Sequence, residues 1–310
     1  MLRRSCARRS GPTGVGNTFA DTLPVPDAIL ETAARIHKGR NVYRSAAHCS
    51  LLLNALATAG WRKEVCSELA ERLRAIQPPY LVPRADSRKT APTYYPIIVL
   101  EGLDGVGKTT VVRHLSERIG GCALATPDPA LDDLRAQFRV APEPIARLFY
   151  CTCNYLGAAT IVDKAMRSPV VVDRWFASTN AMALAAAVVG EAKQPLPDPE
   201  TEGAAYAWPV DLPSPDVRVV LDCPEDIRLK RMQGRGGANR EEERLAADRA
   251  LREAAMTAFA RQGYRKVMVP NYMIAINEIL DQYLLNEKRF AFATQPKRFT
   301  DADIVTAAAY

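Results

Sequence analysis

The chain has 310 residues, of which 48% are hydrophobic and 25% charged, so it can bury the core of one large domain or two smaller ones. The formal net charge is +6, but the basic residues are dispersed apart from the first few positions, and this excess calls for no nucleic-acid partner. No apolar run approaches membrane-spanning length, and seven scattered cysteines do not form a disulfide framework, so we expect them to be reduced.

The first ten residues, MLRRSCARRS, carry four arginines and no acidic residue, and the first carboxylate is Asp21. Two interpretations of residues 1–26 stay open. A mitochondrial transit peptide has this composition and would deliver the protein to the matrix, whereas a disordered basic tail would leave a cytoplasmic location equally compatible.

Residues 27–77 form a predicted helical extension. Ala28, Ile29, Ala33 and Ile36 recur at helical spacing, and further helices are expected over 46–56 and 61–76, separated at Gly60. We find no catalytic constellation in this extension. Residues 78–95 are rich in proline and polar residues and are typical of a linker.

From residue 96 to 287 strand and helix patterns alternate, which predicts an α/β fold with a parallel sheet covered by helices. The candidate strands are 96–100, 121–125, 168–172, 216–222 and 265–269. The candidate helices are 108–119, 130–139, 143–166, 178–190, 225–232, 240–262 and 273–286. Six prolines make residues 191–215 an expected surface loop, and residues 288–310 form a tail without a clear pattern.

A complete phosphate-binding loop pattern, Gly102-x-x-x-x-Gly107-Lys108-Thr109, lies between the first candidate strand and an amphipathic helix. Glycines let backbone N–H groups close on phosphate oxygens, and the dipole of the helix favours an anion at its N-terminus. We expect Lys108 to reach the β- and γ-phosphates of ATP and Thr109 to ligate Mg²⁺. The expected phosphate-binding residues are Gly102, Asp104, Gly105, Val106, Gly107, Lys108, Thr109 and Thr110. The alternative is a glycine-rich turn with a chance lysine.

A second motif, Val170-Val-Val-Asp173-Arg174-Trp175, ends a buried strand with a carboxylate and a guanidinium. Ligands of open α/β sheets bind at the C-terminal ends of strands. Asp173 is therefore a candidate to bind Mg²⁺ or to orient the attacking group. Arg174 is a candidate to bind a phosphate through two hydrogen bonds of its guanidinium. A salt bridge that only caps the next helix is the alternative.

A third motif, Gln233-Gly-Arg235-Gly-Gly-Ala-Asn-Arg240, sets arginines among glycines between two helices. A flap that neutralises charge and excludes water over the phosphates has this composition. A solvated helix–loop–helix with incidental charge is the alternative.

These three motifs resemble the thymidylate kinase family of P-loop nucleoside monophosphate kinases. Further markers, Leu148-Phe-Tyr150-x-x-x-Asn154-Tyr155 and Tyr206-x-Trp208-Pro-x-Asp-Leu212, are most similar to the mitochondrial UMP-CMP kinase 2 group. The resemblance covers about residues 96–285. It implies a five-stranded parallel sheet, ATP and Mg²⁺ as cofactors, and phosphoryl transfer to CMP, UMP, dCMP or dUMP, which gives the diphosphate and ADP.

The resemblance also implies roles for single residues. Asp104 would face the sugar of the acceptor nucleotide, Arg174 would bind its phosphate, and Asp173 would act beside the magnesium. Gly105 stands where some members have a catalytic arginine, so that role passes to Arg235 or Arg240 of the flap.

The acceptor site departs from the family pattern in two places. Trp175 replaces a tyrosine, and the usual arginine after the second strand is missing, so Arg135 becomes its substitute. Tyr150 and Asn154 lie four residues apart on one helix face and are expected to read the acceptor base. Met182 is expected against the sugar.

Two rival functions stay open. One is a thymidylate kinase with dTMP as acceptor, and the other is a nucleotide-binding regulatory protein with vestigial turnover. The expected partners are small-molecule nucleotides, without nucleic acid or a membrane span, and a homodimer is compatible with the sequence.

Overall fold

The computed structural model describes residues 24–38, 40, 42–76, 91–191, 193–233 and 245–308. Residues 1–23 of the predicted transit peptide or tail lie outside the described residues. So do residue 77 at the end of the predicted extension, residues 78–90 of the predicted linker, and both flap arginines, Arg235 and Arg240.

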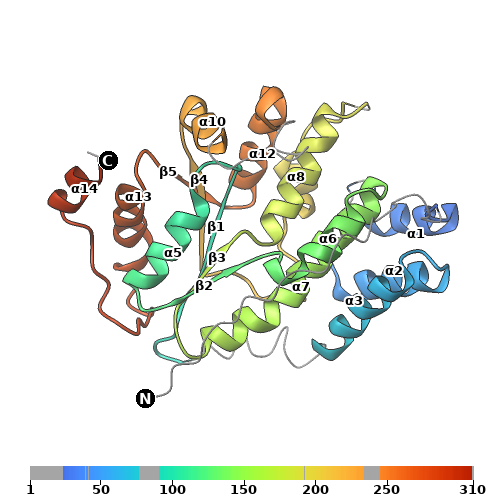
Figure 1. The fold of residues 1–310 in the computed structure, drawn as a ribbon, viewed down its shortest axis with the longest axis horizontal. Helices are drawn as coiled ribbons and strands as arrows, with labels where there is room; N and C mark the ends of the chain where they lie inside the picture. The colour runs from blue at the N-terminus through green and yellow to red at the C-terminus, as the bar shows by residue number, and fades with distance from the viewer. Residues whose placement is uncertain are drawn as a thin grey trace, which may run out of the picture.

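The centre of the molecule is a five-stranded parallel sheet with the order β2-β3-β1-β4-β5 (Figure 1). Its strands are β1 (Ile97–Gly102), β2 (Cys122–Ala125), β3 (Val170–Asp173), β4 (Val217–Asp222) and β5 (Arg265–Met268). Leu100 of β1 is in register with Asp173 of β3 and Val219 of β4, so β1 is flanked on both sides. This confirms the predicted α/β class with five parallel strands.

Helices cover both faces of the sheet. Side chains of the central strand β1 therefore alternate between two hydrophobic cores, one on each face. Ile98 and Leu100 pack in one core, and Ile97 and Val99 in the other. The first core contains α5 (Lys108–Arg118), α13 (Tyr272–Ile279) and the π-helical turn η4 (Leu280–Leu284). The second contains α6 (Asp132–Phe138, after the 3-10 turn η2, Pro129–Leu131), α7 (Glu143–Ala165) and α8 (Phe176–Val189). The helix α12 (Arg249–Arg261) contributes buried residues to both cores.

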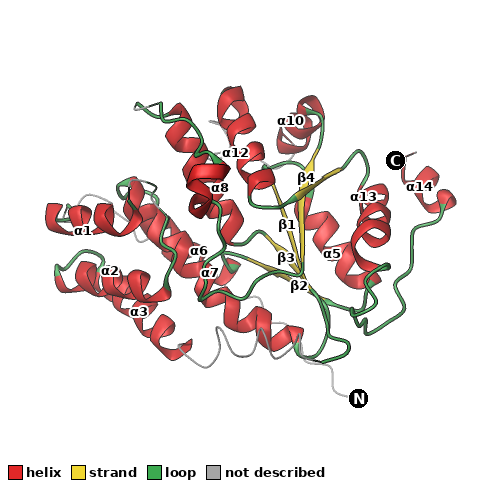
Figure 2. Cartoon of the chain, turned by 180° about the vertical axis from the view of Figure 1, so that it is seen from behind, coloured by secondary structure: helices red, strands yellow, loops and turns green. Residues whose placement is uncertain are grey.

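The N-terminal extension consists of α1 (Asp27–His37), α2 (Ala46–Thr58) and α3 (Lys63–Ile76), which lie as an outer layer beside α7 (Figure 2). Its buried residues belong to the same hydrophobic core as α7 and α8. Arg44 lies before α2 and donates hydrogen bonds to the Ala205 carbonyl at 2.5 Å and to Asn180 at 3.0 Å. The extension is therefore packed onto the helices beside the sheet.

Residues 191–215 differ from the expected surface loop. They contain α9 (Pro199–Glu202) and the 3-10 turn η3 (Gly203–Ala205), and Tyr206 and Leu212 are buried. Asp211 accepts hydrogen bonds from the Ala46 N–H and from the Tyr155 hydroxyl, both at 2.9 Å. The prolines prevent long elements, but the apolar side chains still anchor the segment against the extension.

The helix expected over 240–262 is interrupted. Asp248 is extended, and its carboxylate accepts from the Leu251 N–H at 3.0 Å, so α12 begins only at Arg249. The tail after residue 288 also has structure. Phe299 is buried beneath the Arg118 guanidinium, and α14 (Asp301–Ala308) follows it.

One helix, α7, is long and apolar enough to cross a membrane by length and composition, although no such run was expected from the sequence. In its most apolar window 61% is buried inside the molecule, where it contacts α2, α3 and α8. It is therefore the central helix of the core. The six described cysteines are all free thiols, as expected for reduced residues.

Candidate active site

The phosphate-binding loop joins β1 to α5 and depends on glycines with positive φ angles. Gly102 has φ +138°, and a Cβ there would lie 2.4 Å from the Leu221 carbonyl oxygen. Gly105 has φ +87°, and a Cβ there would lie 2.8 Å from the Arg228 carbonyl oxygen. Close packing of α10 (Glu225–Gln233) on the loop thus excludes any side chain at position 105, including an arginine.

Lys108 lies at the start of α5 with only 6% of its surface exposed. Its Nζ donates to the Leu103 carbonyl oxygen at 2.7 Å and lies 3.8 Å from the Asp104 carboxylate. Burial, together with the charge of Arg174, lowers the pKa of Lys108 to about 8, although nearby carboxylates oppose the shift. The loop holds the ammonium in place, and a bound phosphate would stabilise its charged form.

Thr109 and Asp173 form a candidate magnesium site. The Thr109 hydroxyl donates to Asp173 Oδ2 at 2.7 Å, which joins the first turn of α5 to the end of β3. The other oxygen, Oδ1, is buried without a hydrogen-bond partner among the described residues. Orphaned buried oxygens are rare in proteins, and hydroxyl and carboxylate oxygens are ligands that Mg²⁺ prefers. The two residues therefore fit the ion that the sequence predicts.

Arg174 follows Asp173 with a positive φ of 66°, an uncommon conformation for this residue type. Its Nη1 donates to the Ser178 hydroxyl at 2.9 Å, and its Nη2 donates to Asp104 Oδ1. Burial alone would lower the pKa of Arg174, but the carboxylates of Asp104, Asp173 and Glu101 raise it above its ordinary value. The guanidinium is therefore a fixed cation beside the loop.

Sequence reasoning missed Glu101, which lies in β1 and is completely buried. Its Oε1 accepts from the N–H groups of Trp175 at 2.9 Å and Ser178 at 3.1 Å, and its Oε2 accepts from the Ser178 hydroxyl. Burial raises the pKa of Glu101 to about 7. A carboxylate inside an apolar strand was the signal in the sequence, because such groups are rarely buried without a specific partner.

A cavity of about 290 Å³ lies beside Arg174, and we call it the arginine-rich pocket. It is lined by Leu103, Asp104, Thr126, Pro127, Arg135, Arg139, Arg147, Tyr150, Asn154, Arg174, Trp175, Ser178, Thr179, Met182 and Leu245. All the residues predicted for the acceptor nucleotide thus line one cavity. Four arginines against one carboxylate make it suited to an anion. Arg139 and Arg147 were not predicted.

The amide of Asn154 is already engaged within this pocket. Its Nδ2 donates to the Thr179 hydroxyl at 3.1 Å, and its backbone carbonyl accepts from the Trp175 indole at 2.9 Å. Only 3% of the Asn154 surface is exposed. Thr179, which sequence reasoning missed, therefore fixes the orientation of the Asn154 side-chain amide. In this orientation Oδ1 is the atom that can accept a hydrogen bond.

A second, smaller cavity of about 170 Å³ lies over the phosphate-binding loop, and we call it the loop pocket. It shares Asp104, Thr126, Pro127, Arg135 and Arg174 with the arginine-rich pocket. The rest of its lining is Gly105, Gly107, Lys108, Thr109, Ala125 and Asp173. Three predicted loop residues do not line it: Gly102 packs on β4, Val106 is buried in the core, and Thr110 is exposed on α5.

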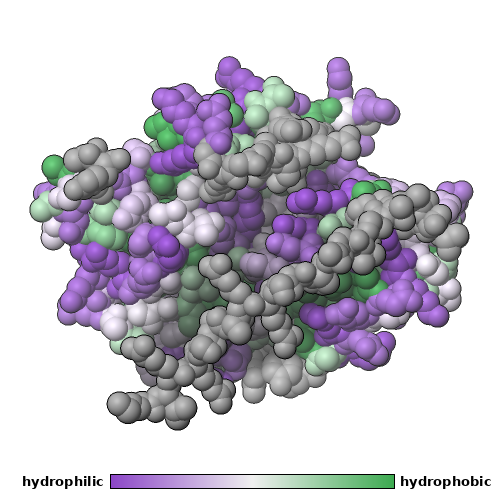
Figure 3. All heavy atoms as spheres, in the orientation of Figure 1, coloured by the Kyte–Doolittle hydropathy of each residue, from purple (hydrophilic) through white to green (hydrophobic). Residues whose placement is uncertain are grey.

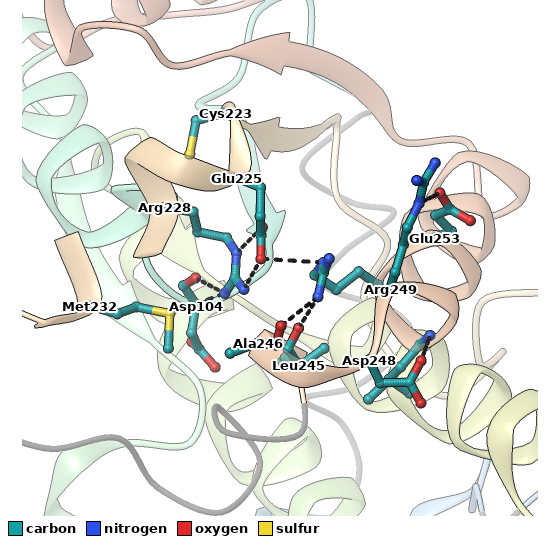
Figure 4. A network of polar contacts seen from close by, with 12 residues as sticks. Asp104, Cys223, Glu225, Arg228, Met232, Leu245, Ala246, Asp248, Arg249 and Glu253 are labelled. Carbon is teal, nitrogen blue, oxygen red and sulfur yellow. Dashed lines mark hydrogen bonds and ion pairs between the residues drawn. The ribbon is translucent and has the colours of Figure 1, made fainter. Parts of the chain in front are cut away.

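A network of polar contacts holds the loop from the side of α10 (Figure 4). Arg228, whose side chain is 1% exposed, donates from Nη1 to the Asp104 carbonyl oxygen at 2.9 Å and pairs with Glu225 at 2.6 Å. Glu225 lies 3.4 Å from Arg252, which donates to the Leu245 and Ala246 carbonyls. The network connects the loop to Leu245 in the arginine-rich pocket.

A larger cavity of about 730 Å³ lies between α3, α5 and α7 and reaches Thr109 and Asp173. Its lining is mostly apolar, and Figure 3 shows hydrophobic side chains recessed in the lower part of this face. The loop pocket places Lys108 and Arg174 beside the candidate metal ligands Thr109 and Asp173. The arrangement can hold two phosphate-bearing molecules on either side of Asp104 and Arg174.

Comparisons with known proteins show which sequences and structures this chain resembles. A sequence model named "Thymidylate kinase" matches residues 100–279. The mitochondrial UMP-CMP kinase 2 of Homo sapiens is 34% identical over 168 residues, which cover 54% of this chain and 37% of that protein. The thymidylate kinase of Xylella fastidiosa (strain 9a5c) is 32% identical over 151 residues, which cover 45% of this chain and 67% of that protein.

Among solved structures, thymidylate kinase from Candida albicans aligns with a TM-score of 0.48 at 17% identity, covering 65% of this chain and 96% of that one. The present chain spans little more than a third of the length of the human relative.

Proposed function

The chain belongs to the thymidylate kinase family, and we propose that it transfers the γ-phosphoryl group of ATP to a pyrimidine nucleoside monophosphate. One observation carries this proposal: the loop pocket and the arginine-rich pocket meet at Asp104, Arg135 and Arg174, directly beside the Thr109–Asp173 pair. A donor phosphate chain in the first and an acceptor phosphate in the second would face each other across this junction.

The residues contribute mainly position and charge. An oxygen of the acceptor phosphate forms a bond to the γ-phosphorus while the bond to the β–γ bridging oxygen breaks, and ADP leaves. Lys108 and the loop N–H groups hold the donor phosphates, and Arg174 with Arg135 holds the acceptor phosphate. Bound Mg²⁺ would supply charge neutralisation at Thr109 and Asp173.

We propose that Arg235 and Arg240 supply the remaining positive charge during transfer. Support comes from Gly105, where a side chain would collide with the Arg228 carbonyl oxygen, so the loop itself has no room for an arginine.

The acceptors proposed are CMP, UMP and their deoxy forms, with thymidylate as the rival. Asn154 supports cytosine, because an amide oxygen accepts from the N4 amino group whereas an arginine only donates. Thymidylate is supported by the family model and by the bacterial relatives. Met182, a flexible side chain in the arginine-rich pocket, supports the use of both ribose and deoxyribose.

An assay of ADP release across CMP, UMP, dCMP, dUMP and dTMP tests the proposal. We expect CMP and UMP to be better acceptors than dTMP, and Asn154→Arg to lower kcat/KM for CMP more than for UMP or dTMP. Equal losses for all bases would show that Asn154 does not read the base. Absence of ADP release with every acceptor would favour the regulatory alternative.

We further propose a mitochondrial location, supported by the four arginines in the first ten residues and by the mitochondrial relative. Fusing residues 1–45 to a fluorescent protein tests it, and a diffuse cytosolic signal would reject it.

A further inference from the structure

The carboxylate of Glu101 occupies a place where an ionised group is costly. It lies in the central strand β1 with none of its surface exposed, and its neighbours Leu100 and Leu103 are buried as well. Such a group is tolerated only when its hydrogen-bonding capacity is used. Here the two oxygens accept three hydrogen bonds, all from the segment that follows β3.

These hydrogen bonds cap α8 from a distant strand. The first N–H groups of a helix have no partner within the helix, and a local side chain normally accepts from one of them. The residue before α8 is Trp175, and no local side chain caps this helix. Glu101 accepts instead from the N–H groups of Trp175 and Ser178, and so fixes the turn that contains Arg174.

The same carboxylate orients the Ser178 hydroxyl. A serine hydroxyl has one proton to donate and can accept with its lone pairs. Ser178 donates its proton to Glu101 Oε2, which leaves the lone pairs of its oxygen to accept from Arg174 Nη1 at 2.9 Å. The chain of hydrogen bonds therefore runs in one direction, from the guanidinium through the hydroxyl to the buried carboxylate.

We propose that Glu101 is a positioning residue for acceptor binding: through Ser178 and the start of α8 it fixes the Arg174 guanidinium toward the acceptor phosphate. Glu101 lines neither the arginine-rich pocket nor the loop pocket, whereas Arg174 lines both, so Glu101 acts only through its neighbours. This inference rests on the proposed function, because it assigns the acceptor phosphate to Arg174.

The ionised form of Glu101 is the one that accepts all three hydrogen bonds, so acceptor affinity should depend on pH. Burial raises the pKa of Glu101 to about 7, within the range where the enzyme can be assayed. The charged or titratable groups that act on it are Arg174, Lys108 at the start of α5, and Tyr264 before β5. The acceptor's own phosphate titrates near pH 6, and this contribution is common to all variants.

The experiment measures KM for CMP and kcat between pH 5.5 and 8.5 for the wild type, Glu101→Gln, Ser178→Ala and the exposed control Glu117→Gln. At pH 8 we expect KM for CMP to rise about tenfold in Glu101→Gln with a smaller change in kcat, because a charge-assisted hydrogen bond is lost. The pH step near 7 should vanish in this variant. In Ser178→Ala the step should move to higher pH, since Glu101 loses a hydrogen bond that favours its charged form.

The Glu117→Gln control should match the wild type, because Glu117 lies on the exposed surface of α5. Wild-type turnover with unchanged KM values and pH profiles in both variants would overturn the role of Glu101 alone. If the wild type phosphorylates no nucleoside monophosphate, the proposed function fails and this inference fails with it.

Discussion

Replacing Arg228 by alanine should destabilise the protein, because this side chain connects α10 to the phosphate-binding loop. Its guanidinium is almost completely buried, donates to the Asp104 carbonyl at 2.9 Å and makes two hydrogen bonds to Glu225 at 2.6 and 2.8 Å (Figure 4). The variant leaves the carbonyl without this donor and opens a void beneath α10.

The magnitude follows from the separate losses. A carbonyl that loses its buried partner costs about 1–3 kcal/mol. The loss of the ion pair adds little, because Glu225 is 35% exposed and keeps Arg252 at 3.4 Å. The void adds about 1 kcal/mol for each buried methylene that is not replaced. We therefore expect about 3 kcal/mol, which lowers Tm by roughly 6–12 °C in a domain of this size.

Thermal unfolding followed by circular dichroism measures this effect, and Arg249→Ala is the matched control. Arg249 also forms an ion pair, with Glu253 at 2.6 Å, but its side chain is 83% exposed. We expect the control to unfold at the wild-type temperature. If both variants shift Tm by the same amount, the Arg228 network does not hold the loop and the reasoning is refuted.

Three further outcomes are expected. Lys108→Ala should lower kcat by orders of magnitude with a nearly unchanged Tm, and near-normal turnover in steady-state assays would contradict the kinase proposal. Arg235→Ala or Arg240→Ala should reduce kcat by about 10³-fold or more, with a smaller loss of ATP affinity measured by calorimetry; full activity in both would assign the flap a structural role only. The pKa of Glu101 is raised to about 7, so the folded protein binds this proton more tightly and loses stability as pH rises from about 4.5 to 7. Chemical denaturation should show a loss of about 3 kcal/mol in the wild type relative to Glu101→Gln over this range, and parallel curves would contradict it.

The sequence by itself determined the elements and the loop. Strands and helices were predicted to within a few residues where apolar periodicity was strong. In β1 and α5 the spacing of apolar residues along the chain is enough to show which side chains are buried. Glycine positions in the phosphate-binding loop could be interpreted in the same way, since positive φ is a local property of Gly102, Gly105 and Gly107. The family also followed from short motifs, and the family model confirms it.

Long-range partners could not be predicted from spacing. Glu101 meets Ser178 77 residues away, and Arg228 meets the Asp104 carbonyl 124 residues away. These contacts arise because the strand order places β1 between β3 and β4, so that the ends of separate strand–helix units converge at one edge of the sheet. No periodicity encodes that order.

Long-range packing also decided how the segment 191–215 and the N-terminal extension contact the rest of the molecule. The prolines predicted a surface loop, whereas packing buries part of this segment and decides that Asp211 accepts from both Ala46 and Tyr155. Burial of these partners depends on α7 lying between the extension and α8, an arrangement set by the complementary apolar faces of several helices together. The helices α7 and α8 also carry Asn154 and Thr179 of the arginine-rich pocket, so their packing against each other decided that these polar groups meet.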